Sequence, residues 1–373
     1  MDQKALKPVR NSSLELLRIL CMFFIVFHHF MLNCAFPKYE VDALNGSDFA
    51  LGTALTLNGF FCIAVNCFIL ITGYFGLKFK VRGFFKLFFV CAFYALLGYL
   101  LHLYLGGSHI GRSVLDYSLF ALSNSRWWFI NCYLVLFFTA PLLNIGIEQM
   151  TKKEYLRVIL LLTIINVYFG FFGGRIGYNQ YGYCVAQFVY LYVIGGYLRR
   201  FVTVDSIEKK RWVSLALAIV FSLMVGLEAN IETFVSHGEL KAFYYNSPLV
   251  VIASVSFFLF MASFHFHSKV VNWLATGAVA VYLFQEQPYI GYHWLYPSVS
   301  DLLVEWKSGA ASFLGSISIS KEFAYLFLLS LVFVLAILLF DHIRALLMIP
   351  VWRVYDKIEQ RLSKHEYPHR FCH

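Results

Sequence analysis

The chain has 373 residues, of which 60% are hydrophobic and only 14% are charged. Because a soluble domain usually carries about 25% charged residues, this composition excludes an ordinary cytosolic enzyme and indicates a protein embedded in a lipid bilayer. The formal net charge of +9 requires no nucleic-acid partner, since basic loops facing an anionic membrane leaflet account for it.

Ten stretches are long and apolar enough to cross a bilayer as helices, which takes about 20 residues each. We predict an all-α fold, a polytopic membrane helical bundle of about ten transmembrane helices over residues 1–350, followed by a basic cytosolic tail over residues 351–373. In chain order the predicted spans are 14–35, 55–77, 84–105, 128–147, 155–174, 181–198, 212–230, 248–265, 270–290 and 323–348.

The basic residues are spread unevenly over the segments that join these spans. If the N-terminus is cytosolic, most of the 30 Lys and Arg residues fall in segments on the cytosolic side. Cytosolic loops of membrane proteins carry such an excess, so the distribution predicts that both termini face the cytosol.

The first span contains an arginine and a histidine eleven residues apart, Arg18 and His29. At 100° per residue they lie within about 20° of one helix face, roughly 16 Å apart along the axis. Ionisable residues inside a membrane span mark a functional site by default. Two alternatives stay open: Glu15 is placed to neutralise Arg18, and His28, about 100° round the helix, is the other candidate histidine.

Further charged residues extend this candidate site. Glu286 falls within the ninth span and serves either as a site residue or as the counter-ion of a buried cation. Arg82 and Lys86 belong to a basic segment between the second and third spans, which is either a cytosolic loop or part of an anion site. The histidines and cysteines show no ligand spacing that predicts a metal centre.

These residue types suggest one kind of chemistry. An imidazole with a pKa near neutrality can take the proton from a hydroxyl as that hydroxyl attacks an ester or thioester carbonyl. A cation near the cytosolic mouth can hold the phosphates of a soluble donor. The residues by themselves predict an intramembrane site with a base and a cation.

Four segments, in order along the chain, combine polar and aromatic residues within apolar stretches: Leu14–Arg18 with Val26–His29 (R-x10-H), Phe60–Ala64 with Leu70–Tyr74 followed by Arg82 and Lys86, Trp127–Ile130 with Pro141, and Val281–Gln285. Together these segments resemble acyltransferase family 3. Two positions depart from the family pattern: Tyr133 stands where many members carry a carboxylate, and Gln285 stands where histidine is common, which makes both poor catalytic candidates.

The resemblance implies a multi-pass O-acyltransferase of the bacterial inner membrane. It implies acetyl-CoA as the cytosolic acyl donor and a hydroxyl of a cell-surface glycan or lipid-linked saccharide as the acceptor. On this basis His29 is the general base, Arg18 orients the donor, and Arg82 and Lys86 contact the CoA phosphates. The expected substrate-lining residues are His28, Trp128, Tyr282 and Glu286.

Several alternatives stay open at this stage. A transporter or flippase for a lipid-linked sugar also places Arg, His and Glu within the membrane, and formation of a product that depends on acetyl-CoA would separate the two classes. A glycan polymerase is a further rival, although its basic residues belong in long outer loops. The sugar, its hydroxyl position, the acyl chain, an acyl-enzyme step and the oligomeric state are not predicted.

Overall fold

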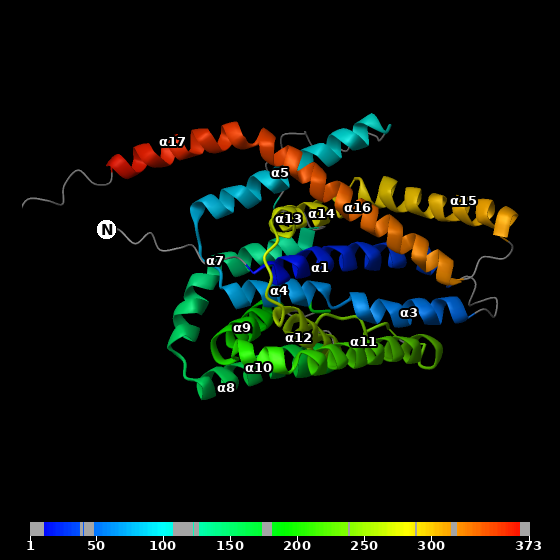
Figure 1. Ribbon diagram of the computed structural model, residues 1–373, viewed down its shortest axis with the longest axis horizontal. Coiled ribbons are helices and arrows are strands. Elements are labelled where there is room, and N and C mark those ends of the chain that lie inside the picture. The colour runs from blue at the N-terminus through cyan, green and yellow to red at the C-terminus, as the bar shows by residue number, and fades with distance from the viewer. Residues whose placement is uncertain are drawn as a thin grey trace, which may run out of the picture.

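The computed structural model describes residues 11–37, 40, 48–106, 122, 127–173, 181–237, 239–287, 289–314 and 319–365. These residues form helices and no strand, which confirms the all-α class. Many of the longer helices run roughly along the long axis of the molecule (Figure 1).

The helices follow one another with short connections in most of the described chain. Those of the first half are α1 (Ser12–Phe30, continued by a π-helical turn, Met31–Ala35), α3 (Phe49–Phe61), α4 (Ala64–Phe75), α5 (Val81–Tyr104), α7 (Trp128–Gln149) and α8 (Lys152–Thr163, continued by a π-helical segment, Ile164–Phe172). Those of the second half are α9 (Val185–Phe201), α10 (Val204–Lys209), α11 (Arg211–Phe234), α12 (Pro248–Ala262), α13 (Lys269–Leu274), α14 (Ala278–Gln285), α15 (Tyr296–Leu314), α16 (Ile319–Leu347) and α17 (Ile349–His365).

Seven of the ten predicted spans form helices that are long and apolar enough to cross a membrane, counted over the described residues. The second of them begins earlier than predicted and is broken between α3 and α4, at Cys62 and Ile63. The seven are Ser12–Ala35, Phe49–Phe75, Val81–Tyr104, Trp128–Gln149, Lys152–Phe172, Arg211–Phe234 and Lys321–Leu347.

The other three predicted spans form shorter helices. Helix α9 has 17 residues and α12 has 15. The ninth predicted span is split into α13 and α14 by a 3-10 turn, Ala275–Gly277. A Cβ atom at Gly277 would lie 3.3 Å from the Asp341 Cβ atom, so α16 approaches the backbone closely at this turn. The break brings the end of α14 into the interior, where Gln285 is buried.

Two helices lie in stretches for which the sequence predicts no membrane span. Helix α15 lies between the ninth and tenth predicted spans, and α17 lies mostly in the predicted tail. Apolar and basic residues interleave along α17 at helical spacing, as in Val351, Arg353, Val354 and Lys357.

Helix α1 lies in the middle of the bundle and packs against α3, α4, α12, α14 and α16 (Figure 1). Its start is fixed by polar contacts to the α12–α13 connection. The Asn11 side chain caps the helix by accepting from the Ser13 N–H at 3.1 Å and donates to the Phe264 carbonyl at 3.1 Å. The Ser12 N–H donates to the Phe266 carbonyl at 2.9 Å. The helix that carries Arg18 and His29 is therefore held from several sides.

Small residues let two helix pairs approach closely, as is typical of helices packed within membranes. A Cβ atom at Gly73 of α4 would collide with the Tyr192 carbonyl of α9, and one at Gly195 of α9 would collide with the Leu70 carbonyl of α4. Helices α3 and α11 meet in the same way through Gly59 and Gly226.

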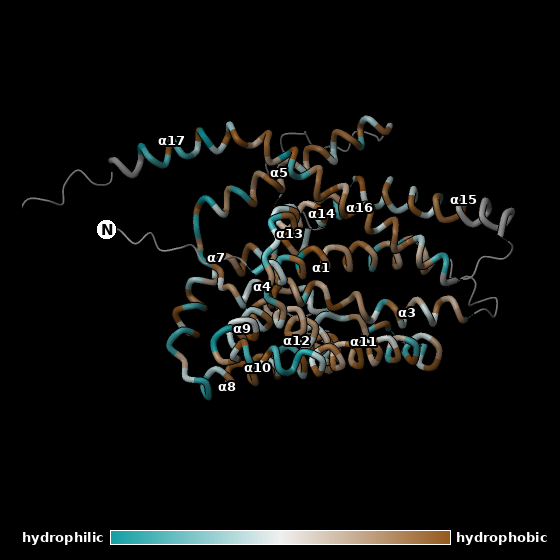
Figure 2. The backbone as a smooth tube through the Cα atoms, viewed as in Figure 1, coloured by the Kyte–Doolittle hydropathy of each residue, from teal (hydrophilic) through white to brown (hydrophobic). Residues whose placement is uncertain are grey.

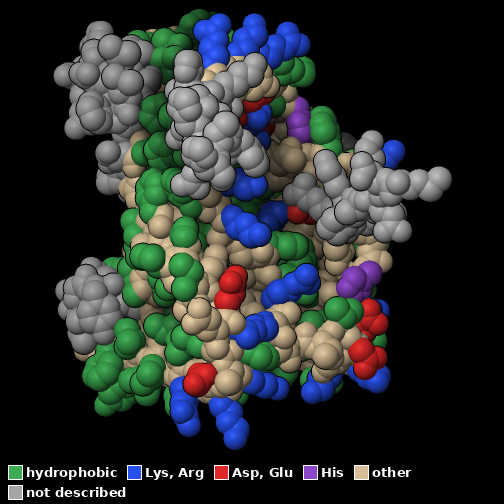
Figure 3. Space-filling view, turned by 90° about the vertical axis from the view of Figure 1, so that its left-hand side faces the viewer, with side chains coloured by type: hydrophobic (Ala, Val, Ile, Leu, Met, Phe, Trp, Pro, Cys, Tyr) green, Lys and Arg blue, Asp and Glu red, His purple; other side chains and the backbone are tan. Residues whose placement is uncertain are grey.

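The connections predicted to face the cytosol gather at one end of the bundle, called the basic end below. Hydrogen bonds join them: the Asn144 amide donates to the Leu77 carbonyl at 2.7 Å, Arg200 to the Ile147 carbonyl at 2.6 Å, and Arg211 to the Ser263 carbonyl at 2.7 Å. Figure 2 shows hydrophilic segments at this end and hydrophobic segments along the helices. Figure 3 looks onto it and shows many Lys and Arg side chains.

Candidate active site

The structure brings His29 and Glu286 together from opposite ends of the chain. His29 is the penultimate residue of α1, and Glu286 directly follows α14. The His29 Nδ1 and Glu286 Oε1 atoms lie 3.1 Å apart, with the side chains 21% and 12% exposed. The two atoms are in contact but not aligned as a hydrogen bond. A carboxylate in this place can set the orientation of an imidazole ring.

A third residue, Tyr296, fixes the carboxylate. Its hydroxyl donates to Glu286 Oε1 at 2.8 Å, and the side chain is buried at the start of α15. Three elements therefore converge on one carboxylate oxygen: α1 through His29, the end of α14 through Glu286 itself, and α15 through Tyr296. The arrangement resembles a base with a carboxylate that orients it, the pattern of general-base catalysis.

His28 is held differently from its neighbour. Its Nδ1 atom lies 2.5 Å from the Asn58 Oδ1 atom of α3, and both residues are buried. Its ring centroid lies 5.5 Å from that of His29. Of the two histidines, His29 is the more exposed and the one that contacts a carboxylate, which favours it as the base.

Arg18 has its own carboxylate near the start of α1. Its Nη1 atom lies 2.7 Å from Glu15 Oε1, and its side chain is 25% exposed whereas that of Glu15 is 2% exposed. The guanidinium also lies 5.7 Å from the centre of the Phe75 ring. A guanidinium has five N–H donors, so this pairing leaves donor capacity for an anion. Glu286 contacts His29.

Arg82 and Lys86, the predicted phosphate ligands, lie at the start of α5 and contact α17. The Arg82 Nη1 atom is 2.6 Å from Asp356 Oδ1, with both side chains about 40% exposed. The Trp352 ring lies 5.7 Å from the Arg82 guanidinium and 5.9 Å from the Lys86 ammonium. Helix α17 therefore contributes a carboxylate and an aromatic face to this cation pair.

The two aromatic residues predicted to line the substrate site, Trp128 and Tyr282, both pack against the ring of Phe129. Trp128 begins α7, is half-buried and meets the Tyr183 ring edge-on at 4.5 Å. Tyr282 is buried, with its ring 5.8 Å from that of Phe129. Gln285, which replaces the histidine common in the resembling family, is fully buried.

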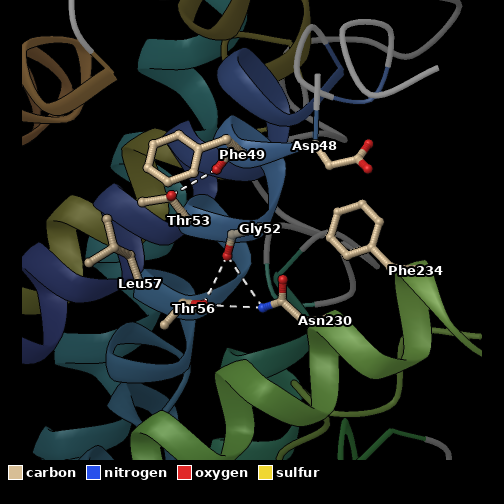
Figure 4. A pocket seen from close by; sticks show the side chains of 8 residues that line it. All are labelled: Asp48, Phe49, Gly52, Thr53, Thr56, Leu57, Asn230 and Phe234. Carbon is tan, nitrogen blue, oxygen red and sulfur yellow. Dashed lines mark hydrogen bonds between the residues drawn. The ribbon is translucent and has the colours of Figure 1, made fainter. Parts of the chain in front are cut away.

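A cavity of about 470 Å³ lies between α3 and α11 (Figure 4), and neither His29 nor Glu286 is among the residues that line it. Its Asn230 amide already donates to the Gly52 carbonyl at 3.3 Å, to Thr56 Oγ1 at 3.1 Å and to the Gly226 carbonyl at 2.7 Å. The Thr53 and Thr56 hydroxyls donate to backbone carbonyls of α3, so these polar groups already have partners within the protein. Its lining residues are Asp48, Phe49, Gly52, Thr53, Thr56, Leu57, Asn230 and Phe234.

The sequence profile of the family described as "Acyltransferase domain", acyltransferase family 3, matches residues 11–342. The chain belongs to acyltransferase family 3. Together with its apolar helices, this membership makes the protein a membrane acyltransferase. Neither a curated protein nor a solved structure matches the chain.

The matched region of this family 3 acyltransferase includes Arg18, His29 and Glu286, whereas α17 lies beyond it. Sequence reasoning missed Asn58, Tyr296 and Asp356, the partners of His28, Glu286 and Arg82. No spacing pattern could have found them, because each belongs to a helix that is brought into contact only by tertiary packing.

Proposed function

We propose that this membrane acyltransferase transfers an acetyl group from acetyl-CoA to a hydroxyl of a cell-surface or lipid-linked glycan in the bacterial inner membrane. The observation that carries the proposal is the His29–Glu286 pair, completed by Tyr296, on the central helix of an acyltransferase family member. A partly exposed imidazole with an oriented carboxylate is what activation of a hydroxyl requires.

In this proposal His29 works through Nε2, because Nδ1 faces Glu286. The acceptor hydroxyl gives its proton to Nε2 as its oxygen attacks the thioester carbonyl. A C–O bond forms, the C–S bond breaks, and the proton passes from the imidazolium to the departing thiolate of CoA. Glu286 stabilises the imidazolium while Tyr296 holds the carboxylate in place.

The donor enters from the basic end in this proposal. Arg82 and Lys86 hold the phosphates of CoA, and Arg18, near the start of α1, orients the thioester arm. His29, roughly 16 Å further along α1, meets the acceptor. The separation along α1 gives donor binding and acceptor chemistry different depths in the membrane.

The test uses the purified protein in phospholipid nanodiscs with isotope-labelled acetyl-CoA, and mass analysis of the surface glycan from cells with and without the chain. We expect His29→Gln to lower transfer at least a hundredfold, the scale of general-base catalysis. The matched control is His265→Gln, since His265 also lies 3.1 Å from a carboxylate, that of Glu208, but at a half-exposed site. Full activity in His29→Gln would refute the assignment.

The transporter alternative is not favoured by the family membership. The same assay separates the two: a transporter moves the saccharide without consuming acetyl-CoA, whereas the transferase releases one CoA for each acetyl group that reaches the glycan.

A further inference from the structure

A cluster of aromatic rings gathers at the starts of α7 and α9 and is not used by the proposed chemistry. Its centre is Tyr183, whose ring lies 4.5 Å from that of Trp128 and 4.9 Å from that of Tyr245. The Trp128 and Tyr245 rings are stacked with centroids 5.8 Å apart. Tyr183 is 46% exposed, so a face of this cluster is open.

The open ring of Tyr183 packs against the ring of the buried Tyr245 and lies within electrostatic range of Glu286. A second exposed ring belongs to the segment just before α15: Tyr292 is 42% exposed, and its ring lies 5.2 Å from that of Tyr296, whose hydroxyl binds Glu286. Tyr292 is therefore linked to the Glu286 carboxylate through one intervening tyrosine.

The backbone before Tyr183 is held in an unusual conformation. Tyr181 has φ of 62° and Gly182 has φ of 79°, both in the left-handed region that favours glycine. A Cβ atom at Gly182 would lie 2.7 Å from the Asn246 nitrogen, so this turn is pressed against the 245–246 backbone. The Tyr245 N–H donates to the Tyr181 carbonyl at 3.0 Å and closes the contact.

Two buried amides fix the other side of this contact. The Tyr245 carbonyl accepts from Asn66 at 2.9 Å and from Gln187 at 2.7 Å, and both amide side chains are fully buried. A non-glycine residue with positive φ persists where its surroundings over-determine it, and such positions cluster at ligand sites. The ring of Tyr183 is therefore presented by a rigid support.

Membrane proteins also carry tyrosine and tryptophan in belts at the membrane–water interface. A residue of such a belt needs only an apolar ring within the membrane and a polar group in contact with water. It does not need a left-handed turn, buried amides behind it, or packing on two further aromatic rings. These three features together favour a binding platform.

We propose that Tyr183, flanked by Trp128 and Tyr292, is the acceptor subsite, on which a pyranose ring of the saccharide stacks so that one of its hydroxyls reaches His29. The proposal rests on the proposed function and names the part of the site that recognises the sugar. The apolar C–H face of a pyranose packs on aromatic rings, while its hydroxyls find the tyrosine hydroxyls and Glu286 at the edge.

Binding is tested without catalysis by saturation-transfer NMR on the full chain in phospholipid nanodiscs, which carry no sugar headgroups. The probes are methyl glucoside, methyl galactoside and methyl N-acetylglucosaminide. We expect saturation of ring C–H protons by the wild-type protein, its loss in Tyr183→Ala, and its retention in Tyr183→Phe and His29→Gln. Tyr183→Leu, which keeps bulk without an aromatic face, gives the same loss if the alanine variant fails to fold.

The matched control is Tyr104→Ala, which removes a tyrosine that is 86% exposed at the end of α5. We expect it to bind as the wild type does. In the transfer assay Tyr183→Ala raises the KM for the acceptor about tenfold, the scale of one aromatic contact, and leaves the KM for acetyl-CoA unchanged.

The outcomes separate the two proposals. Saturation that depends on Tyr183 without any acetylated glycoside supports the subsite and refutes the acetyl transfer. Acetylated glycoside with equal acceptor KM in Tyr183→Ala and the wild type refutes the subsite. No saturation of any probe by the wild type, or equal saturation in Tyr183→Ala, overturns the inference as well.

Discussion

The Oε1 atom of Glu286 accepts a hydrogen bond from the Tyr296 hydroxyl and also contacts the His29 imidazole. Because Tyr296 and His29 meet the same oxygen of Glu286, the two residues have separate roles that can be tested. Tyr296 acts on the carboxylate, and the carboxylate acts on His29, so loss of either should be felt at His29 without any direct contact with the donor.

We expect Glu286→Gln to lower kcat at least a hundredfold, because the neutral amide cannot stabilise the imidazolium. Tyr296→Phe should lower kcat about tenfold, the worth of one hydrogen bond to a charged group, with both KM values unchanged. Steady-state kinetics and the pH profile of kcat measure this. A change in expression level with an unaltered pH profile would instead make Tyr296 a packing residue.

The sequence predicts a contact in this site only when the two partners lie close together in the chain. Glu15 and Arg18 are three residues apart on one helix, so their ion pair follows from helix geometry. His28 and His29 are adjacent, and helix geometry cannot say which contacts Glu286 and which contacts Asn58, because the directions of α3 and α14 decide it.

At the scale of elements, α17 provides binding partners for the cations on α5. Asp356 forms an ion pair with Arg82, and the Trp352 ring packs near both Arg82 and Lys86. If CoA phosphates bind these cations, they compete with a carboxylate from the C-terminal helix. A half-exposed ion pair of this kind contributes only about 0.2–1 kcal/mol, so a donor with several negative charges can displace it.

Asp356→Asn should therefore lower the KM for acetyl-CoA by up to about fivefold, with kcat unchanged. Donor titration at saturating acceptor measures the change. The control is Glu359→Gln, which removes one negative charge from an exposed position on the same helix. A higher KM in Asp356→Asn would mean that α17 assists donor binding.

Length explains which elements the sequence could predict. Seven spans are continuous apolar stretches whose helical state is required by the bilayer itself. Helix α14 is much shorter, and it starts at the turn where α16 approaches the backbone of Gly277. The hydropathy of a segment does not predict where a neighbouring helix will contact its backbone.

At the scale of the whole molecule, the basic end gives the bundle a direction. If that end faces the cytosol, Lys78→Cys and Asp48→Cys, both at exposed positions, should label from opposite sides of the membrane. An impermeant maleimide applied to spheroplasts should modify only Asp48→Cys. The described native cysteines are buried or half-buried, so their background is low. Labelling of Lys78→Cys in intact spheroplasts would reverse the orientation.

The hydrogen bonds that join the start of α1 to the α12–α13 connection have a consequence for biosynthesis. Ser12 is hydrogen-bonded to Ser268, which lies 256 residues further along the chain. The ribosome therefore releases α1 long before this late partner segment exists, and α1 rests in the bilayer with only its early partners, α3 and α4, until α12 to α14 have been inserted. In the proposed site Glu286 and Tyr296 are made after Arg18, His29 and Arg82, so a nascent chain stalled before Glu286 carries the proposed donor cations and base without the carboxylate proposed to orient that base.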